Sequence, residues 1–143
     1  MAVSDRRHSA SRLGTDGCAS NNGLDLFREM DMLAKTQKTR TGSPTAMTAR
    51  DVLSCATISG AQAVGVPDCG TIYPGCCADL IIVNTRSAHL VPFYSQDILV
   101  YAASGSDVDT VIINGEVVVR DKQLLAFDLE EVYLEQVREL IRD

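Results

Sequence analysis

The side chains that could hold a metal ion or act as a nucleophile are few in this sequence and far apart. Its two histidines, His8 and His89, form no His-x-His pair, whereas a catalytic zinc site takes about three protein ligands, often histidines. Asp16 stands in Gly-Thr-Asp-Gly, where an aspartate ordinarily shapes a turn or a helix entry. Ser20 has no base near it in the sequence, which disfavours a nucleophilic serine. Taken singly, these residues predict no complete catalytic site.

The five cysteines are the other group of reactive side chains. Cys76 and Cys77 are adjacent, and neither forms a Cys-x-x-Cys spacing with another cysteine, so a zinc-thiolate site is not expected. An odd number of cysteines behind a polar leader predicts reduced thiols rather than a disulfide framework. The role of Cys76 and Cys77 stays open at this point.

Length and charge exclude several classes of protein. The 143 residues are enough for one domain, but an eight-stranded β/α barrel needs roughly 200 to 250 residues. The net charge of −6 comes from acidic residues spread along the chain, which argues against a nucleic-acid surface. No apolar run approaches the ~18 residues of a membrane span. We therefore expect a cytoplasmic protein with neither nucleic-acid nor membrane partners.

Two helices are expected in the first half of the chain. Apolar residues recur at helical spacing within residues 22–38, with Asn22 as the expected cap. Residues 48–64 form the second expected helix, because Thr48 and Asp51 have the spacing of a capping box. Its many alanines and glycines would allow close packing on a sheet.

Short strands and a final helix are expected in the second half. Residues 71–73 form a short extended run, residues 80–83 are an apolar strand, and residues 110–120 are typical of a hairpin. The Asn-Gly dipeptide at 114–115 favours a type I′ turn. A capped helix begins near Asp128. The order of elements predicts a mixed α+β chain.

From Leu13 onward, ordered motifs carry a resemblance to a known family. Residues 13–22, LGTDGCASNN, resemble the last catalytic strand of amidohydrolases in the 5-methylthioadenosine/S-adenosylhomocysteine deaminase, guanine deaminase and triazine chlorohydrolase group. ATISGA at 56–61, PGCCADLIIV at 74–83 and VIING at 111–115 are similar to later motifs of that group. Each motif alone is a common pattern, but together and in order they identify the chain as a member of the amidohydrolase superfamily.

The resemblance implies an α+β or α/β fold class, namely the C-terminal part of a metal-dependent hydrolase. It divides the chain into a disordered or non-native leader (1–12), the last strand-helix elements of a (β/α)8 barrel (13–66), the C-terminal half of a small β-sandwich (67–125) and a terminal helix (126–143). In complete relatives both chain ends build the sandwich. Barrel and sandwich are therefore both expected to be incomplete, with an N-terminal portion missing.

The resemblance also implies the site residues. Asp16 would lie at the mouth of the last barrel strand, approach a divalent zinc or iron ion, and take a proton from the metal-bound water. Ser20 and Asn21 are candidates for binding the substrate, which the resemblance implies to be a purine or a triazine-like small molecule. The family's histidine ligands have no counterpart, and His89 is expected to be a surface or packing residue. We therefore expect Asp16 to hold a metal weakly and the chain to be inactive alone.

Two alternatives to a portion of a deaminase remain open. One is a non-catalytic remnant or binding module, which the polar leader of residues 1–12 favours. The other is one chain of a split enzyme that a partner completes. Half a sandwich would leave strand edges and apolar surface that a partner, or a second copy in a homo-oligomer, would cover.

Overall fold

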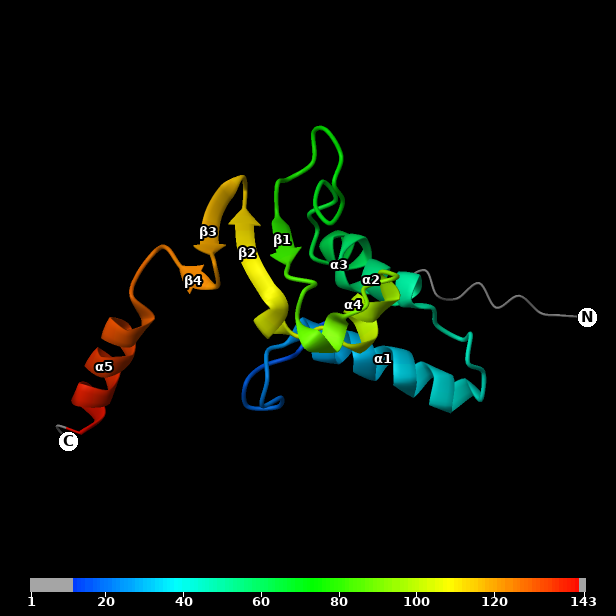
Figure 1. Ribbon diagram of the computed structural model, residues 1–143, viewed down its shortest axis with the longest axis horizontal. Coiled ribbons are helices and arrows are strands. Elements are labelled where there is room, and N and C mark those ends of the chain that lie inside the picture. The colour runs from blue at the N-terminus through cyan, green and yellow to red at the C-terminus, as the bar shows by residue number, and fades with distance from the viewer. Residues whose placement is uncertain (1–11, 142–143) are drawn as a thin grey trace, which may run out of the picture.

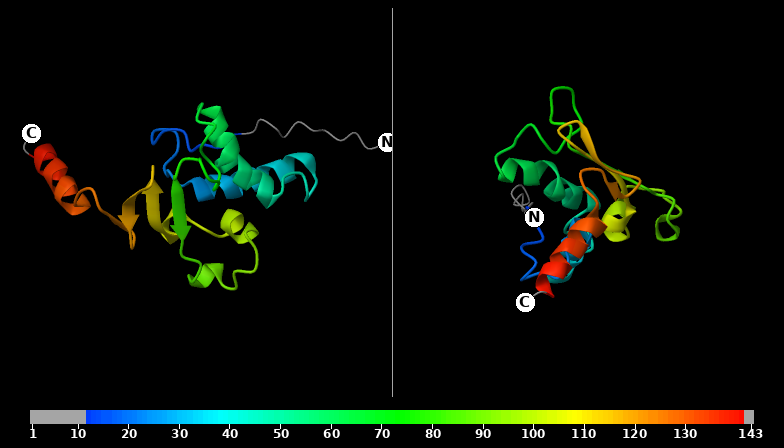
Figure 2. Two further views of the ribbon diagram at one scale, coloured as in Figure 1. Left: turned by 90° about the horizontal axis from the view of Figure 1, so that it is seen from above. Right: turned by 90° about the vertical axis from the view of Figure 1, so that its left-hand side faces the viewer.

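The computed structural model describes residues 12–141, so residues 1–11 of the expected leader lie outside the described part. Helices α1, α2 and α3 lie next to the β1 edge of a four-stranded sheet, and α5 lies beyond the opposite edge, away from the other helices (Figures 1 and 2). In chain order the described elements are α1 (Leu26–Thr41), α2 (Ala49–Ala56), α3 (Ile58–Ala63), β1 (Leu80–Val83), the 3-10 helix η1 (Ala88–Leu90), α4 (Asp97–Tyr101), the 3-10 helix η2 (Gly105–Asp107), β2 (Val108–Ile113), β3 (Glu116–Arg120), β4 (Gln123–Leu124) and α5 (Leu129–Leu140).

Helix α1 starts later than expected, and Asp25 caps it instead of Asn22. The Asp25 carboxylate accepts a hydrogen bond from the backbone N–H of Phe27 at 3.0 Å. Asn22 stands four residues before the first helical residue, too far to reach the free N–H groups of the first turn. Gly42 ends the helix in the left-handed conformation, at φ 64°, as is common at helix C-termini.

The second expected helix is present but broken in two. Its capping box is confirmed: the Thr48 hydroxyl accepts from Asp51 N–H, and the Asp51 carboxylate accepts from Thr48 N–H. At Thr57 the backbone leaves the helical conformation, and α3 begins one residue later. The backbone at Gly70 packs against this break, since a Cβ on Gly70 would lie 2.7 Å from Ile58 Cα. Helix α2 packs on α1 and α4 rather than on the sheet.

The sheet is antiparallel, with the strand order β1-β2-β3-β4. Strand β1 and the hairpin of β2 and β3 confirm the expectations, and both turn residues have positive φ, 50° at Asn114 and 82° at Gly115. The extended run expected at residues 71–73 is wrong, because these residues form no ladder and Tyr73 instead closes a turn with Cys76. The helix expected from Asp128 is present as α5.

The buried core lies among the helices. It consists of Met30 and Ala34 from α1, Met47 before α2, Ala49, Val52 and Cys55 from α2, and Val100 from α4. Helix α4 lies in a segment for which the sequence predicted no element. Within residues 12–141, every helix is too short or too polar to cross a membrane.

Candidate functional site

The loop that carries Asp16 runs without regular structure into α1. Residues 12–17 form no strand, so the strand end expected near Leu13 is absent from the described residues. The physical reason is that a barrel strand needs a neighbouring strand to hydrogen-bond, and in the described chain none pairs with residues 12–17. Asp16 is exposed and has a left-handed backbone, at φ 58°.

A tight turn follows Asp16 and holds its carboxylate in place. One oxygen of Asp16, Oδ1, accepts a hydrogen bond from Gly17 N–H at 2.8 Å. The carbonyl of Gly17 then accepts from the N–H groups of Ser20 at 3.0 Å and Asn21 at 2.9 Å. Asp16 therefore has the turn geometry that its Gly-Thr-Asp-Gly context favours, and its carboxylate remains open to solvent.

The two candidate substrate-binding residues make bonds that shape this turn. The Ser20 hydroxyl donates to the Gly17 carbonyl at 3.0 Å. Asn21 joins the turn to α1, since its Nδ2 donates to Glu29 Oε1 at 2.7 Å while its Oδ1 accepts from Gly23 N–H at 3.3 Å. Through these two hydrogen bonds, Asn21 positions the loop that carries Asp16 against α1.

The residues around Asp16 do not make a metal site by themselves. Across residues 12–141, no three side chains from His, Cys, Asp and Glu gather closely enough to hold an ion. His8 lies outside the described residues. A single exposed carboxylate binds zinc or iron weakly, because stable sites take several ligands. Asp16 therefore belongs to no metal-ligand set among the described residues.

His89 belongs to a different cluster, built around the buried Asp107. Asp107 is only 2% exposed, and its carboxylate accepts hydrogen bonds from Ser87 Oγ at 2.9 Å and from Ser104 N–H at 2.9 Å. His89 Nε2 lies 2.9 Å from Asp107 Oδ2. Burial alone would raise the pKa of Asp107, but the hydrogen bonds from His89, Ser104 and Ser87 outweigh it and lower that pKa to about 2.

The Asp107 cluster was missed by the sequence interpretation. The signal that could have found it is the spacing of Ser104 and Asp107, which form a capping box around η2. The cluster joins the segment that contains η1 to the start of β2, since Asn84 N–H also donates to the Asp107 carbonyl at 2.8 Å. His89 is an exposed residue that contacts Asp107, in line with the expectation of a surface or packing residue.

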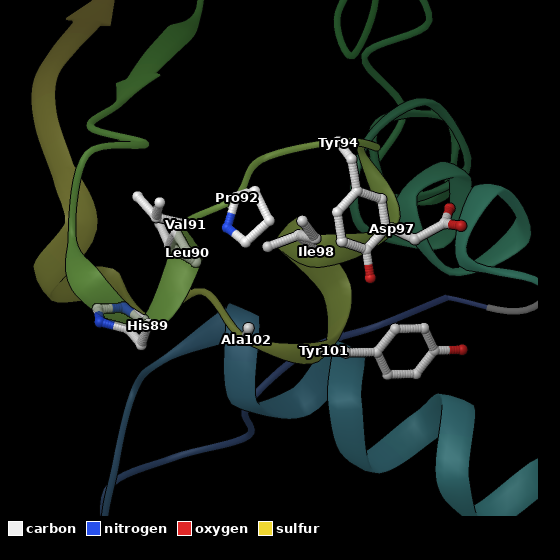
Figure 3. Close-up of a pocket in the computed structure, with 9 residues that line it drawn as sticks. All are labelled: His89, Leu90, Val91, Pro92, Tyr94, Asp97, Ile98, Tyr101 and Ala102. Carbon is white, nitrogen blue, oxygen red and sulfur yellow. The ribbon is translucent and has the colours of Figure 1, made fainter.

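A cavity of about 490 Å³ lies between η1 and α4. His89 stands at one end and Tyr94 and Asp97 at the other (Figure 3). Its lining residues are His89, Leu90, Val91, Pro92, Tyr94, Asp97, Ile98, Tyr101 and Ala102. None of the residues expected from the sequence to bind substrate is among them. The structure thus keeps this cavity apart from the Asp16 turn.

Comparisons with known proteins give a consistent result. The model of the amidohydrolase family matches residues 6–118. The chain is 49% identical to a 5'-deoxyadenosine deaminase of Methanothermobacter thermautotrophicus, over 89% of the chain and 29% of the relative. It is 51% identical to a 5-methylthioadenosine/S-adenosylhomocysteine deaminase of Syntrophobacter fumaroxidans, over 91% of the chain and 30% of the relative.

Solved structures show the same similarity. An adenosine deaminase from Xanthomonas campestris with bound zinc superposes with a TM-score of 0.83 at 36% identity, over 90% of this chain and 30% of that one. An atrazine chlorohydrolase from Arthrobacter aurescens complexed with zinc gives a TM-score of 0.76 at 25% identity, over 85% of this chain and 28% of that one. The chain thus spans about 30% of the length of the relatives it matches.

Proposed function

The chain belongs to the amidohydrolase family, and from this premise we propose that it contributes to the hydrolytic deamination of an adenosine-type purine. The observation that carries the proposal is the identity of 49% and 51% to two deaminases across about nine-tenths of the chain. The similarity to the atrazine chlorohydrolase is lower, at 25%, which favours loss of ammonia over loss of chloride. A cytoplasmic location and a homo-oligomer stay predictions.

Asp16 is the residue we assign to proton transfer. Hydrolytic deamination adds water to the ring carbon that carries the amino group, so a nearby group must accept a proton and a proton must reach the departing nitrogen. The turn holds Asp16 by one oxygen only, since in the described residues Asp16 Oδ2 accepts no hydrogen bond. An exposed carboxylate oxygen in a fixed turn suits this role.

Metal chemistry is not assigned to the described residues. Two of the similar structures carry zinc, but here Asp16 belongs to no group of three or more potential metal ligands among residues 12–141. These residues do not fit a metal ion on their own, and no step above is routed through one. We therefore propose that the 143-residue chain alone does not deaminate purine nucleosides.

A graft tests the proposal. Residues 13–141 would replace the matching segment of the Methanothermobacter 5'-deoxyadenosine deaminase, and ammonia release from 5'-deoxyadenosine would be followed. We expect the graft to be active and Asp16→Asn to reduce its rate about 100-fold or more, as expected for loss of a positioned acid-base group. Asp121→Asn is the matched control, because Asp121 is also exposed and left-handed, at φ 51°. Equal activity of the two variants would remove Asp16 from the mechanism.

The alternatives lead to different results with the free chain. Calorimetric binding of 5'-deoxyadenosine without ammonia release would indicate a binding module. Restoration of activity by a separately produced N-terminal portion of the Methanothermobacter enzyme would indicate a chain that a partner completes. The exposed side chains of Ile81 and Ile82 on β1, each 53% accessible, are the observation in favour of such a partner.

A further inference from the structure

Three cysteines lie in the turn between α3 and β1, where the proposed deamination uses no residue. Cys77 is exposed, while Cys69 and Cys76 are partly buried. The N–H of Cys77 donates to the carbonyl of Asp68 at 2.8 Å, which closes the turn and brings Cys77 beside Cys69. Cys69 Sγ also donates to Asp79 Oδ2, at 3.6 Å.

Both sides of this turn are anchored. Gly70 has φ 83°, and it packs so closely on Ile58 that a Cβ would clash there, so the chain next to Cys69 is fixed against α3. On the other side, Asp79 Oδ1 accepts from Asn114 N–H at 2.7 Å, which joins the turn to the β2–β3 hairpin. Packing of Gly70 on Ile58 therefore fixes the chain beside Cys69, and the Asp79–Asn114 hydrogen bond fixes the chain that follows Cys77.

The two cysteines are neighbours across the turn, because the N–H of Cys77 is hydrogen-bonded to the carbonyl of Asp68, the residue before Cys69. The nearby Cys77 thiol is the largest cause that raises the pKa of Cys69 well above its ordinary value. Partial burial and the Asp79 carboxylate raise it further. The exposed Cys77 is the sulfur that a reagent in solution reaches first.

We propose that Cys69 and Cys77 form a reversible intramolecular disulfide by exchange with small-molecule disulfides, of which oxidised glutathione is the probe. The proposal rests on the closed turn, the Cys69–Asp79 hydrogen bond and the exposure of Cys77. It is independent of the deaminase assignment, since Asp16 and its turn take no part.

The exchange proceeds in two balanced steps. The Cys77 thiolate attacks one sulfur of oxidised glutathione, so that a Cys77–glutathione bond forms, the glutathione S–S bond breaks, and one glutathione thiolate leaves. The Cys69 thiolate then attacks Cys77 Sγ, so that the Cys69–Cys77 bond forms and the second glutathione leaves. The two protein thiols are oxidised, and the two released thiolates take up their two protons. Reduced glutathione reverses both steps.

Asp79 is a positioning residue that slows the second step. Once Cys77 carries glutathione, its thiol no longer raises the pKa of Cys69, and burial and the Asp79 charge remain as causes. A carboxylate beside a thiol disfavours the thiolate, which is the attacking species. Asp79→Asn removes the charge and keeps a side-chain oxygen for the Asn114 N–H.

The first experiment treats the full chain with excess oxidised glutathione, alkylates the remaining thiols, and maps the modified residues by mass spectrometry. We expect the wild-type chain to lose two hydrogen atoms of mass, with Cys69 and Cys77 protected from alkylation. Cys69→Ser should stop at a glutathione adduct on Cys77. Cys76→Ser is the matched control, from the same turn, and should behave as the wild type. Separate adducts on Cys69 and Cys77 in the wild type, or a bridge that includes Cys76, would overturn the proposal.

The second experiment follows ring closure over time. In Asp79→Asn the glutathione adduct on Cys77 should disappear about three- to tenfold faster near neutral pH, because a lower pKa of Cys69 provides more thiolate. The same variant should shift the pH profile of closure to lower pH, a readout that a merely structural role would not move. An unchanged rate and profile would remove the role assigned to Asp79.

Discussion

The helical region and the sheet region of this chain differ in how completely they bury their side chains. Residues from α1, α2 and α4 form one buried cluster together with Met47, which precedes α2, and Met47, Val52 and Val100 are each 0 or 1% exposed. Strands β1 to β4 contribute no residue to that cluster, and Ile81, Ile82 and Ile113 are each 53% exposed. The helical region therefore has its own core, whereas the sheet exposes apolar surface of a kind that a second layer would cover.

The largest expected effect tests this difference directly. Met47→Ala removes a side chain that is 1% exposed, and we expect it to lower the free energy of unfolding by about 2 to 5 kcal/mol. Ile82→Ala in β1 should cost less than about 1 kcal/mol, since half of that side chain already contacts solvent. Urea denaturation of both variants measures the two values. Equal losses would show that the sheet has a core as complete as that of the helices.

A glycine in the loop that links the helices to the sheet gives the next effect. Gly70→Ala places a Cβ 2.7 Å from Ile58 Cα at φ 83°, and backbone strain together with the clash should cost about 2 to 3 kcal/mol. Gly75→Ala has a similar φ, 93°, but open space around the Cβ, so its cost should be about 1 kcal/mol. The difference between the urea midpoints of the two variants measures the cost of the close contact between residue 70 and α3. Equal midpoints would show that the turn moves away from α3 at little cost.

The buried carboxylate at the start of β2 predicts a pH dependence. The pKa of Asp107 is lower in the folded chain than its ordinary 3.8, at about 2. The ionised carboxylate therefore stabilises the fold above about pH 4, and this contribution is lost as the pH falls toward 2. We expect a loss of about 2 kcal/mol across that window. Asp107→Asn should lack this component, and Asp109→Asn, its neighbour on β2, is the control in the same acid titration of unfolding.

Local patterns in the sequence were sufficient where a few neighbouring residues decide the structure. Thr48 and Asp51 cap their helix as expected, and Asn114 and Gly115 form the expected turn. Each depends on backbone geometry within four residues. The α+β architecture and the family were likewise predicted, because the motifs occur in order along the chain.

The sequence interpretation failed where a distant segment decides the local structure. The helix break at Thr57 packs against Gly70, thirteen residues later, and the buried Asp107 is hydrogen-bonded by Ser87 and His89 from another segment. Contacts between segments far apart in the sequence leave no periodic pattern of apolar residues from which they could be predicted. The division of the chain at residues 66 and 125, and the roles of Asp16, Ser20 and Asn21, stay predictions for the same reason.

The smallest expected effect on stability concerns Asp16, and it separates function from folding. Asp16 is exposed, and its carboxylate makes one hydrogen bond, to the adjacent Gly17 N–H. Asparagine keeps an oxygen for that bond and tolerates the left-handed backbone at φ 58°. We therefore expect Asp16→Asn to change the free energy of unfolding by less than about 0.5 kcal/mol in urea, although the same change should silence the grafted deaminase. A loss of 2 kcal/mol or more, well above the range for surface substitutions, would mean that Asp16 holds the loop together. The loss of activity would then report misfolding rather than a missing proton acceptor.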